Sequence, residues 1–283
     1  MQPVFRFAPS PNGELHLGHA YAALLGFKLC RELGGRFLLR MEDIDRSRCR
    51  PEYEALIKDE LAWLGLSWEE PVRRQSEHFA EYRAALDRLA AKGLVYPSFA
   101  SRAEIEAATG PQVPRDPDGA PLHRGLVREL DPAEAARLIA AGTPYSFRLK
   151  TDRAVALAGP LAWREEGAGP NGEQGNIAAD PTIWGDFVVA RKETPTSYHL
   201  AVVADDAAQG VTHVVRGRDL FLATAAHALL QKLLDLPAPA YHHHRLITDG
   251  SGRKLAKSNA DTALRALRAA GATPADIGRM VGL

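Results

Sequence analysis

A strand, a tight turn and a helix follow one another at the start of the chain, and this unit constrains the fold more than any other feature. Residues 4–8 ("VFRFA") are typical of a short buried strand, and the turn-forming "PSPNG" follows them. The alanine- and leucine-rich segment after the turn predicts a helix that ends at the glycine pair 34–35. Residues 36–42 ("RFLLRME") then predict a second buried strand. Strands that alternate with helices of this length indicate a parallel sheet in an α/β fold.

The alternation of helices and strands continues, breaks off near residue 96 and returns near residue 185. Amphipathic helices are expected at 51–66 and 77–93. Between residues 96 and 185 the proline and glycine content rises and the strand-like pieces are short, apart from a well-capped helix at 131–142. We therefore expect an inserted α+β lobe in this part of the chain.

Strand character returns after the insert, and the end of the chain is helical. Residues 185–192, 197–206 and 211–217 predict strands, whereas the tail from residue 257 predicts helices, with Thr273 and Pro274 opening the last one. The expected boundaries are 1–95 for the first half of the parallel-sheet domain, 96–185 for the insert, 186–245 for the second half, and 246–283 for a loop and a short helical appendage.

The composition limits the classes of protein to which the chain can belong. With 283 residues, 46% of them hydrophobic, it can bury a sizeable core. No apolar run reaches the length of a membrane span and the first residues lack a secretory signal pattern, so we expect a cytoplasmic protein without membrane contact. Cys30 and Cys49 are too few for a disulfide framework or a four-cysteine zinc site, which agrees with a reducing compartment.

The formal net charge of the chain is zero, which argues against indiscriminate nucleic-acid binding. Several arginines are nevertheless close in sequence: Arg36, Arg40, Arg46, Arg48 and Arg50. They form either a local basic face that holds a phosphate backbone or a solvated charged surface, and the second reading is the commoner one.

Two histidines, His16 and His19, stand where the first turn meets the first helix. A helix that follows a strand and a tight turn presents its free N–H groups and its positive dipole end at the sheet edge, where phosphate binds. Residues three apart on a helix share a face, so both histidines can point at one ligand, and Gly18 leaves room for a flat base or ribose. Alone, this short pattern is equally typical of an ordinary pair of histidines.

A second pattern, "DGSGRKLAKSNAD", lies near the other end of the chain. Lys254 and Lys257, followed by Ser258, come after a run of glycines. Lysines on such a loop can contact a triphosphate and neutralise the charge that builds up as pyrophosphate leaves. Taken by itself, the segment is more often a solvated basic loop.

Together, the two patterns resemble the paired HIGH and KMSKS sequences of the class I aminoacyl-tRNA synthetases, here "HLGH" and "KLAKS". The segments "RFAPSPNGELHLGH", "RMEDIDRSR", "SYHLAVVADD", "GVTHVVRGRDL" and "RKLAKSN" are similar to the glutamyl branch of that family and extend over nearly the whole chain. The resemblance implies a Rossmann-type nucleotide-binding domain, split by an insert that binds the acceptor end of tRNA. It also implies ATP and Mg²⁺ as cofactors, with catalytic roles for His16, His19 and Lys257.

The resemblance further implies two sets of binding residues. The ATP set is Pro9, His16, Gly18, His19, Lys254, Lys257 and Ser258. The glutamate set is Arg6, Phe7, Ala8, Pro9, Ser10, Glu42, Tyr198 and Arg216.

Residue chemistry independently favours glutamate as the amino acid. Glutamate carries two carboxylates and one ammonium group, so it needs cations for the first two and an anion for the third. Arg6 and Arg216 are the natural cations, Glu42 is the natural anion, and Ser10 and Tyr198 add hydroxyl groups. Which arginine receives which carboxylate stays open, and each residue alone has an ordinary structural reading.

The expected reaction requires no protein nucleophile. The α-carboxylate of glutamate attacks the α-phosphorus of ATP, and glutamyl-adenylate and pyrophosphate result. Positioning and stabilisation of negative charge supply the catalysis, as in phosphoryl transfer generally. Two other classes stay open: a nucleotidyltransferase-like protein that acts on a small ligand, and a catalytically inert tRNA-binding module.

Two possible metal sites are not expected to bind metal. His242, His243 and His244 are consecutive, and neighbours on a strand point to alternate faces, so they cannot readily close on one ion. Many glutamyl-type relatives carry a Cys-x-Cys zinc knuckle where this chain has Ser98 and Ala100, and His123 alone cannot replace it. We therefore expect no structural zinc.

The end of the chain bears on the identity of the acceptor. Only 24 residues follow "KLAKSN", which we expect to be too short for a separate anticodon-binding domain. The chain thus resembles the truncated glutamyl-queuosine tRNA-Asp synthetases. These activate glutamate without tRNA and attach it to queuosine at the anticodon wobble position, with the anticodon stem-loop of tRNA-Asp as partner. The alternative is a minimal glutamyl-tRNA synthetase that charges a tRNA 3′ end, and in either case we expect a monomer.

Overall fold

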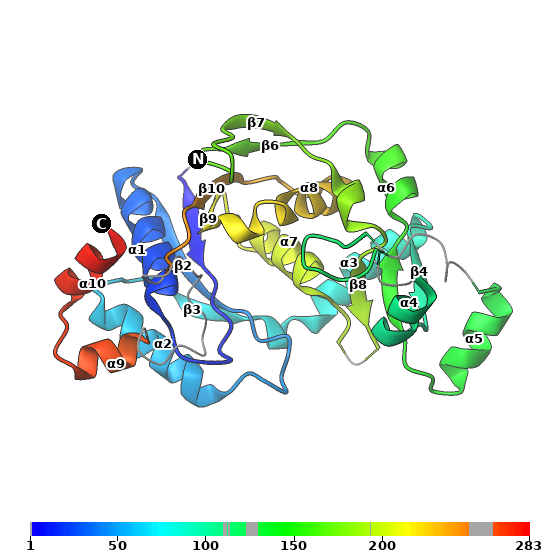
Figure 1. The fold of residues 1–283 in the computed structure, drawn as a ribbon, viewed down its shortest axis with the longest axis horizontal. Helices are drawn as coiled ribbons and strands as arrows, with labels where there is room; N and C mark the ends of the chain where they lie inside the picture. The colour runs from blue at the N-terminus through cyan, green and yellow to red at the C-terminus, as the bar shows by residue number, and fades with distance from the viewer. Residues whose placement is uncertain (1, 110–111, 113, 123–129, 193, 249–262) are drawn as a thin grey trace.

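A seven-stranded sheet forms the centre of the protein (Figure 1). The computed structural model describes residues 2–109, 112, 114–122, 130–192, 194–248 and 263–283. The strands in spatial order are β3 Glu69–Arg74, β2 Arg36–Met41, β1 Val4–Phe7, β9 His213–Gly217, β10 Ala240–His244, β6 Ala162–Glu165 and β7 Gly175–Ala178. All neighbouring strands are parallel except the pair β6 and β7. The prediction of an α/β fold around a parallel sheet is therefore confirmed.

Helices lie on both faces of this sheet and around the second lobe (Figure 1). Their bounds are α1 Leu17–Glu32, α2 Pro51–Trp63, α3 Phe79–Ala91, α4 Arg102–Thr109, α5 Pro132–Ala140, α6 Thr151–Ala158, α7 Tyr198–Ala208, α8 Ala223–Leu233, α9 Leu264–Ala269 and α10 Pro274–Val281. Short 3₁₀ turns among the described residues are η1 Gln75–Glu77, η2 Pro181–Trp184 and η3 Arg218–Leu220. In the part of the chain that the structure describes, no helix is long and apolar enough to cross a membrane.

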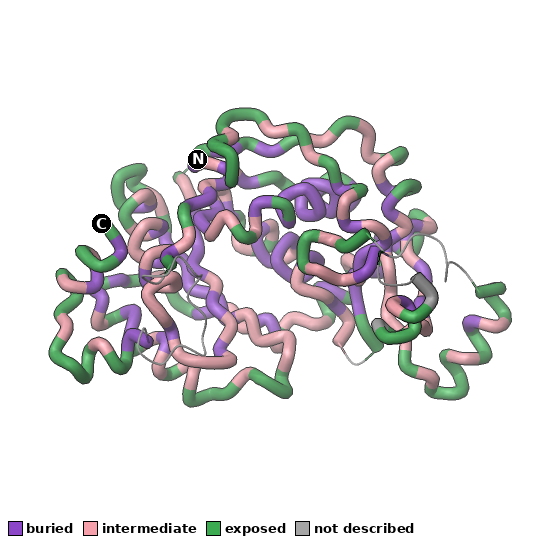
Figure 2. Tube along the Cα trace, viewed as in Figure 1, coloured by how far each residue is buried: buried purple, intermediate pink, exposed green. Residues whose placement is uncertain are grey.

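The two faces of the sheet differ in chemistry because side chains alternate along each strand. Phe5 and Phe37 point to the face that α1 covers, and they belong to one apolar core with residues of α1 and α2. The opposite face, where α7 and α8 lie, buries three arginines: Arg6 on β1, Arg40 on β2 and Arg216 on β9. Figure 2 shows buried residues concentrated along the sheet and these two helices. The charged groups are thus held inside the molecule on one face of the sheet.

The second lobe is built on a three-stranded antiparallel sheet of β4 Val95–Ser98, β5 Ser146–Leu149 and β8 Val188–Arg191. This agrees with an α+β insert, but the lobe does not take up one continuous stretch of the chain. β6 and β7, from within the expected insert, extend the central sheet, and β8, from beyond it, pairs with β5. The exact domain boundaries stay a prediction.

The prediction of a strand at residues 197–206 is wrong, because this segment forms α7. Ser197 caps the helix, and its side chain accepts a hydrogen bond from the backbone N–H of Leu200. The segment is apolar almost without interruption because it is buried on nearly every side, from Leu200 to Val203 and again at Asp205 and Asp206. A short apolar run of this kind has no periodicity that separates a buried helix from a buried strand.

Two expected helix starts are confirmed by their hydrogen bonds. The Asp131 side chain accepts from the N–H of Ala133 at the start of α5, with Pro132 as the first helical residue. Thr273 and Asp276 form a reciprocal capping box at the start of α10. This last helix packs against α1 and closes the sheet domain at the C-terminal end of the described chain (Figure 1).

Candidate active site

The two histidines of the first turn lie side by side at the N-terminus of α1. The Nδ1 atom of His16 accepts from the N–H of Gly18 at 3.0 Å, and the Nδ1 atom of His19 accepts from the N–H of His16 at 3.2 Å. Their ring centroids are 3.9 Å apart. Because each Nδ1 accepts, a neutral ring carries its hydrogen on Nε2. The pair therefore has donor groups suited to phosphate oxygens.

Gly18 has a structural reason in this turn. A Cβ atom at this position would lie 2.9 Å from Cε1 of His16. Any other residue would push the capping imidazole out of place. The glycine thus keeps the His16 ring in its position at the helix start, besides leaving the backbone open.

Lys254, Lys257 and Ser258 lie outside the described residues. The chain is described again from Ala263, and this residue forms an antiparallel bridge with His16. The N–H of Leu264 also donates to the carbonyl of Leu15 at 2.8 Å. The C-terminal flank of the lysine segment is therefore attached directly to the histidine turn.

Four of the five charged or hydroxyl-bearing residues expected to bind glutamate lie at one edge of the sheet. Arg6 lies near the end of β1, Glu42 follows β2, and Arg216 lies near the end of β9; carboxyl ends of parallel strands meet at one edge. Tyr198 reaches the same place as the first residue of α7. The charges of Arg216, Glu42 and Arg6 all act on the Tyr198 hydroxyl, and burial raises its pKa to about 12. The sequence predicts that Tyr198 lies on a strand. It lies on a helix instead, but close to Arg6, Glu42 and Arg216.

Phe7, Ala8, Pro9 and Ser10 form the short connection from β1 to the histidine turn. Phe7 is the last residue of the strand and is buried in the core with α1. The carbonyl of Pro9 accepts from the N–H of Glu42 at 3.0 Å. This bond ties the segment to the end of β2, so both parts of the expected glutamate set are held together.

A buried cluster of charges lies next to these residues, and we call it the carboxylate cluster: Arg6, Arg40, Glu42, Asp205 and Asp206. One oxygen of Asp206 accepts from Nε of Arg6 at 3.1 Å and from Nη1 of Arg40 at 2.7 Å. Burial alone would raise the pKa of Asp206, but the two guanidinium groups lower it overall. Arg40 also contacts Glu42 at 3.3 Å and Asp205 at 3.7 Å.

Glu42 differs from its partners in this cluster. Burial raises the pKa of its carboxyl, and the opposing effects of Arg40 and Arg6 do not cancel that rise. A carboxylate with an incompletely compensated charge can receive an ammonium group. This agrees with the expected role of Glu42 toward the substrate.

Arg216 lies in a second buried group, which we call the imidazole cluster: Arg216, Thr224, His199, His227 and His243. The three guanidinium nitrogens of Arg216 contact its neighbours: Nε lies 3.1 Å from His243, Nη1 lies 3.2 Å from His227, and Nη2 lies 2.8 Å from Thr224. Burial lowers the pKa of His243 to about 4 and that of His227 well below its usual value. These partners are therefore neutral at pH 7.

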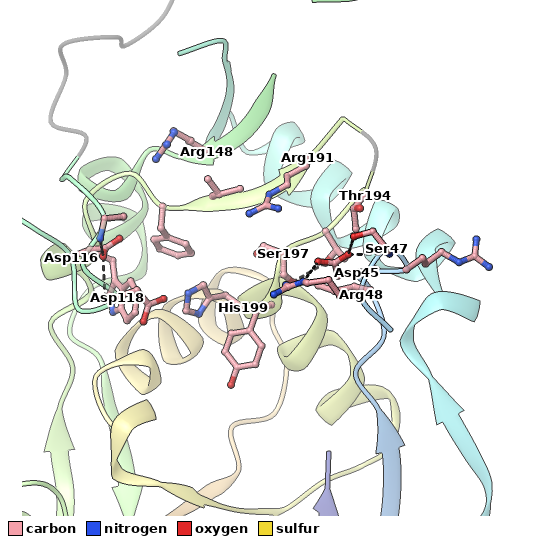
Figure 3. Close-up of a pocket in the computed structure, with 18 of the residues that line it drawn as sticks. Asp45, Ser47, Arg48, Asp116, Asp118, Arg148, Arg191, Thr194, Ser197 and His199 are labelled. Carbon is pink, nitrogen blue, oxygen red and sulfur yellow. Dashed lines mark hydrogen bonds and ion pairs between the residues drawn. The ribbon is translucent and has the colours of Figure 1, made fainter. Parts of the chain in front are cut away.

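A cavity of about 1070 Å³ lies between the sheet domain and the second lobe (Figure 3). Residues 44–48 line one side, and residues of β5, β8 and the start of α7 line others. Figure 3 shows Arg148 and Arg191 from the second lobe and Asp45 and Arg48 from the loop after β2. Tyr198 and His199 also line it. The cavity thus adjoins the expected glutamate site at Tyr198.

Among the residues considered for metal binding, those that the structure describes form no ligand set. Ser98 is buried on β4, and neither its hydroxyl nor the methyl group of Ala100 is a usual zinc ligand; His123 lies outside the described residues. On β10, His243 contacts Glu165 and Arg216, whereas His244 packs against Tyr21. Among the described residues, no three histidine, cysteine or acidic side chains could hold one metal ion.

Sequence reasoning missed several residues of the site. Asp206 accepts hydrogen bonds from both Arg6 and Arg40. Asp206 lies in a segment for which the sequence predicts a strand, and Arg40 lies in an apparently ordinary strand. His243 was considered only as a metal ligand, and His227 and Thr224 on α8 were not considered. The one available signal for these residues was the run of three histidines at 242–244. This run lies on β10, the strand that pairs with the "VVRG" strand β9.

Comparisons with known proteins show the family to which this chain belongs. A family model described as the catalytic domain of class I tRNA synthetases (E and Q) matches residues 4–282. A Rhodobacter capsulatus protein named glutamyl-Q tRNA(Asp) synthetase is 49% identical over 99% of this chain and 100% of its own length. A Symbiobacterium thermophilum protein of the same name is 40% identical over 95% of this chain and 82% of its own length.

A solved structure shares the fold as well. The glutamate-tRNA synthetase of Elizabethkingia anophelis matches with a TM-score of 0.75 and 27% identity. The match covers 92% of this chain and 54% of that one, so this chain spans about half of the larger synthetase. The chain therefore belongs to the class I tRNA synthetase family, in its glutamyl and glutaminyl (E and Q) branch, and is an ATP-dependent ligase.

Proposed function

We propose that the protein activates L-glutamate with ATP and transfers the glutamate to queuosine at the anticodon wobble position of tRNA-Asp. The observation that carries this proposal is the similarity to proteins named glutamyl-Q tRNA(Asp) synthetase. Four relatives of that name are 40–49% identical to this chain, whereas four relatives named glutamate-tRNA ligase are 35–37% identical. The shared E and Q family alone would fit either activity.

The first step is adenylate formation, and it does not need tRNA. Arg216 and Arg6 receive the carboxylates of glutamate, Glu42 receives its ammonium group, and Tyr198 adds a hydroxyl group. The α-carboxylate attacks the α-phosphorus of ATP, whose phosphates carry Mg²⁺, and pyrophosphate leaves. His16, His19 and Lys257 balance the charge that develops on the phosphates.

The second step is transfer to the nucleotide. A hydroxyl group of queuosine attacks the carbonyl carbon of glutamyl-adenylate, an ester forms, and AMP leaves. The cavity beside Tyr198 supports this step, because it has aromatic walls from Trp184 and Phe187 and arginines that suit a nucleotide. We propose that the modified nucleotide enters there, between the second lobe and residues 44–48.

The test uses radiolabelled glutamate, ATP and purified tRNAs. We expect label on tRNA-Asp that contains queuosine, and no label on tRNA-Asp from cells that cannot make queuosine. Removal of the 3′-terminal nucleotides of the tRNA separates the two attachment sites. Label that persists on this shortened tRNA supports attachment at the anticodon.

Three results would contradict the proposal in different ways. Label on the 3′ end of tRNA-Glu would make the protein a minimal glutamyl-tRNA synthetase. Glutamate-dependent pyrophosphate exchange with no label on any tRNA would favour a nucleotidyltransferase-like enzyme with a small acceptor. Activation of glutamate only when tRNA is present would refute the tRNA-independent first step.

A further inference from the structure

Arg216 is held in a way that differs from the other buried arginines near the site. Arg6 and Arg40 both donate to the carboxylate of Asp206. Arg216, which is 5% exposed, forms no ion pair with any acidic side chain among the described residues. Its charge is therefore not neutralised by direct contact with a carboxylate.

The hydrogen bonds around Arg216 fix the tautomers of its two histidine partners. A guanidinium group only donates, so Nε2 of His243 accepts from Nε of Arg216, and Nδ1 of His227 accepts from Nη1. Each neutral ring must then carry its hydrogen on the other nitrogen. His227 therefore donates through Nε2 to Nδ1 of His199, at 3.2 Å.

Glu165 is the group that selects the tautomer of His243. Its Oε2 lies 2.6 Å from Nδ1 of His243, and its Oε1 accepts from the backbone N–H of the same residue at 2.9 Å. Gly167 donates to Oε1 at 3.0 Å, and the indole of Trp163 donates to Oε2 at 3.3 Å. Burial acts to raise the pKa of Glu165, but these bonds from His243 lower it overall. The carboxylate is ionised and surrounded by donors, so Nδ1 of His243 must carry a hydrogen.

The register of the sheet brings these residues together. His243 on β10 lies directly opposite Arg216 on β9, so both side chains emerge on the same face. Glu165 ends β6, the next parallel strand. The turn after it approaches β10 so closely that a Cβ atom at Gly167 would lie 2.4 Å from the carbonyl oxygen of His243.

Thr224 completes the arrangement from α8. Its hydroxyl accepts from Nη2 of Arg216 at 2.8 Å and lies 3.3 Å from Nε2 of His243. The guanidinium group thus has three neutral acceptors for three of its five N–H groups. A direct pair with Glu165 would occupy the fork that binds a carboxylate in two-point fashion.

We propose that Glu165 and His243 are positioning residues for Arg216. Glu165 holds His243 in the tautomer that accepts from Arg216, and the imidazole keeps the carboxylate away from the guanidinium group. Arg216 thereby keeps both its orientation and its charge for a carboxylate of the amino-acid substrate. This inference rests on the proposed function and adds two residues to the recognition of glutamate.

The experiment measures KM for glutamate and kcat in pyrophosphate exchange, with variants at both positions. In Glu165→Gln, the new amide NH₂ needs an acceptor, and only Nδ1 of His243 can become one, by moving its hydrogen to Nε2. That hydrogen then opposes the N–H of Arg216. We expect KM for glutamate to rise about tenfold, with kcat changed less than about threefold.

A matched pair at His243 separates positioning from simple structural support. The amide of Gln can reach the position of Nε2 and keep an acceptor for Arg216, whereas the amide of Asn reaches only the position of Nδ1, next to Glu165. We expect His243→Asn to raise KM more than His243→Gln, although both variants lose the same ring. His242→Gln, at the neighbouring and half-buried position of β10, is the control and should leave KM unchanged.

The outcomes are distinct. A larger KM increase for His243→Gln than for His243→Asn, or an unchanged KM for Glu165→Gln, would overturn the positioning roles while the wild-type enzyme still uses glutamate. If the wild-type protein shows no exchange with glutamate, the proposed function itself fails, and this inference fails with it.

Discussion

The carboxylate cluster and the imidazole cluster lie on the same face of the sheet, yet they treat their arginines in opposite ways. In the first, Arg6 and Arg40 share Asp206, so positive and negative charges cancel inside the protein. In the second, Arg216 is held by neutral imidazoles and a hydroxyl group. A buried cation that is oriented but not neutralised, such as Arg216, is suited to a substrate anion, whereas Arg40, which contacts three carboxylates, is suited to holding the structure together.

The first way to test this difference is to remove an arginine from the carboxylate cluster. Arg40 has an exposed fraction of 0%, and Arg40→Ala would leave Asp205 and Asp206 buried without full compensation. We expect the free energy of unfolding to fall by about 3–5 kcal/mol, as measured by urea denaturation at pH 7. Arg36→Ala is the control, because its pair with Glu69 is exposed to solvent and should contribute far less to the free energy of unfolding. Equal losses of stability in the two variants would contradict a structural role for the carboxylate cluster.

Removal of the arginine from the imidazole cluster should affect binding more than stability. We expect Arg216→Ala to raise KM for glutamate about a hundredfold, because a charge-assisted contact to a buried carboxylate is lost. Its unfolding midpoint should change less than that of Arg40→Ala. Arg164→Ala, whose side chain is exposed on β6, provides the comparison. A large loss of stability with an unchanged KM would reverse the assignment of the two clusters.

Acid should weaken the imidazole cluster before the carboxylate cluster. Burial lowers the pKa of His199 to about 4, so the unfolded chain binds a proton at higher pH than the folded one. Neutral His199 therefore contributes fully to the free energy of unfolding above about pH 6.5, and this contribution is lost as the pH falls toward 4. Asp206, whose pKa is below its usual value, loses its contribution only at lower pH.

The variant His199→Asn isolates this effect, because asparagine keeps an acceptor near Nδ1 but does not titrate in this range. Between pH 7 and pH 5 we expect the variant to lose about 2 kcal/mol less stability than the wild type, in denaturation curves at each pH. The same pH dependence in both proteins would mean that His199 does not contribute to the acid sensitivity.

The smallest effect is expected at Tyr198, where the two clusters meet. Tyr198→Phe removes one hydroxyl group and keeps the ring that packs against His199 and His227. We expect KM for glutamate to rise about fivefold, which corresponds to about 1 kcal/mol for one hydrogen bond. Kinetics of glutamate-dependent exchange would measure it. No change would exclude this hydroxyl from substrate binding.

The sequence was sufficient for the architecture of the sheet and for its signature turn. The alternation of strands and helices predicted the parallel sheet. The spacing of His16 and His19 predicted that both side chains would lie on one face of the helix, and their ring centroids are 3.9 Å apart. The sequence was insufficient for α7, because an apolar segment buried on all sides has no helical periodicity. That error also concealed Asp206, whose position on the helix directs it toward Arg6 and Arg40.

The support of Arg216 could not be predicted for a different reason. Glu165 belongs to a part of the chain expected to form the insert, and only the pairing of β6 with β10 brings it beside His243. His227 and Thr224 come from a helix that shows no sign of function in its sequence. The expected ligands of glutamate could be named from chemistry, whereas the groups that orient them depend on long-range register, which a single sequence does not show.

Pyrophosphate exchange by the wild-type protein, with each amino acid in turn and without tRNA, tests the central claim most directly. The claim is that Arg216, with its charge left free of a direct carboxylate partner, makes the site selective for glutamate. We expect exchange with glutamate, and little with glutamine, which lacks the second carboxylate, or aspartate, which is one methylene shorter. Equal exchange with glutamine or aspartate, or exchange with glutamate that requires tRNA, would contradict the account.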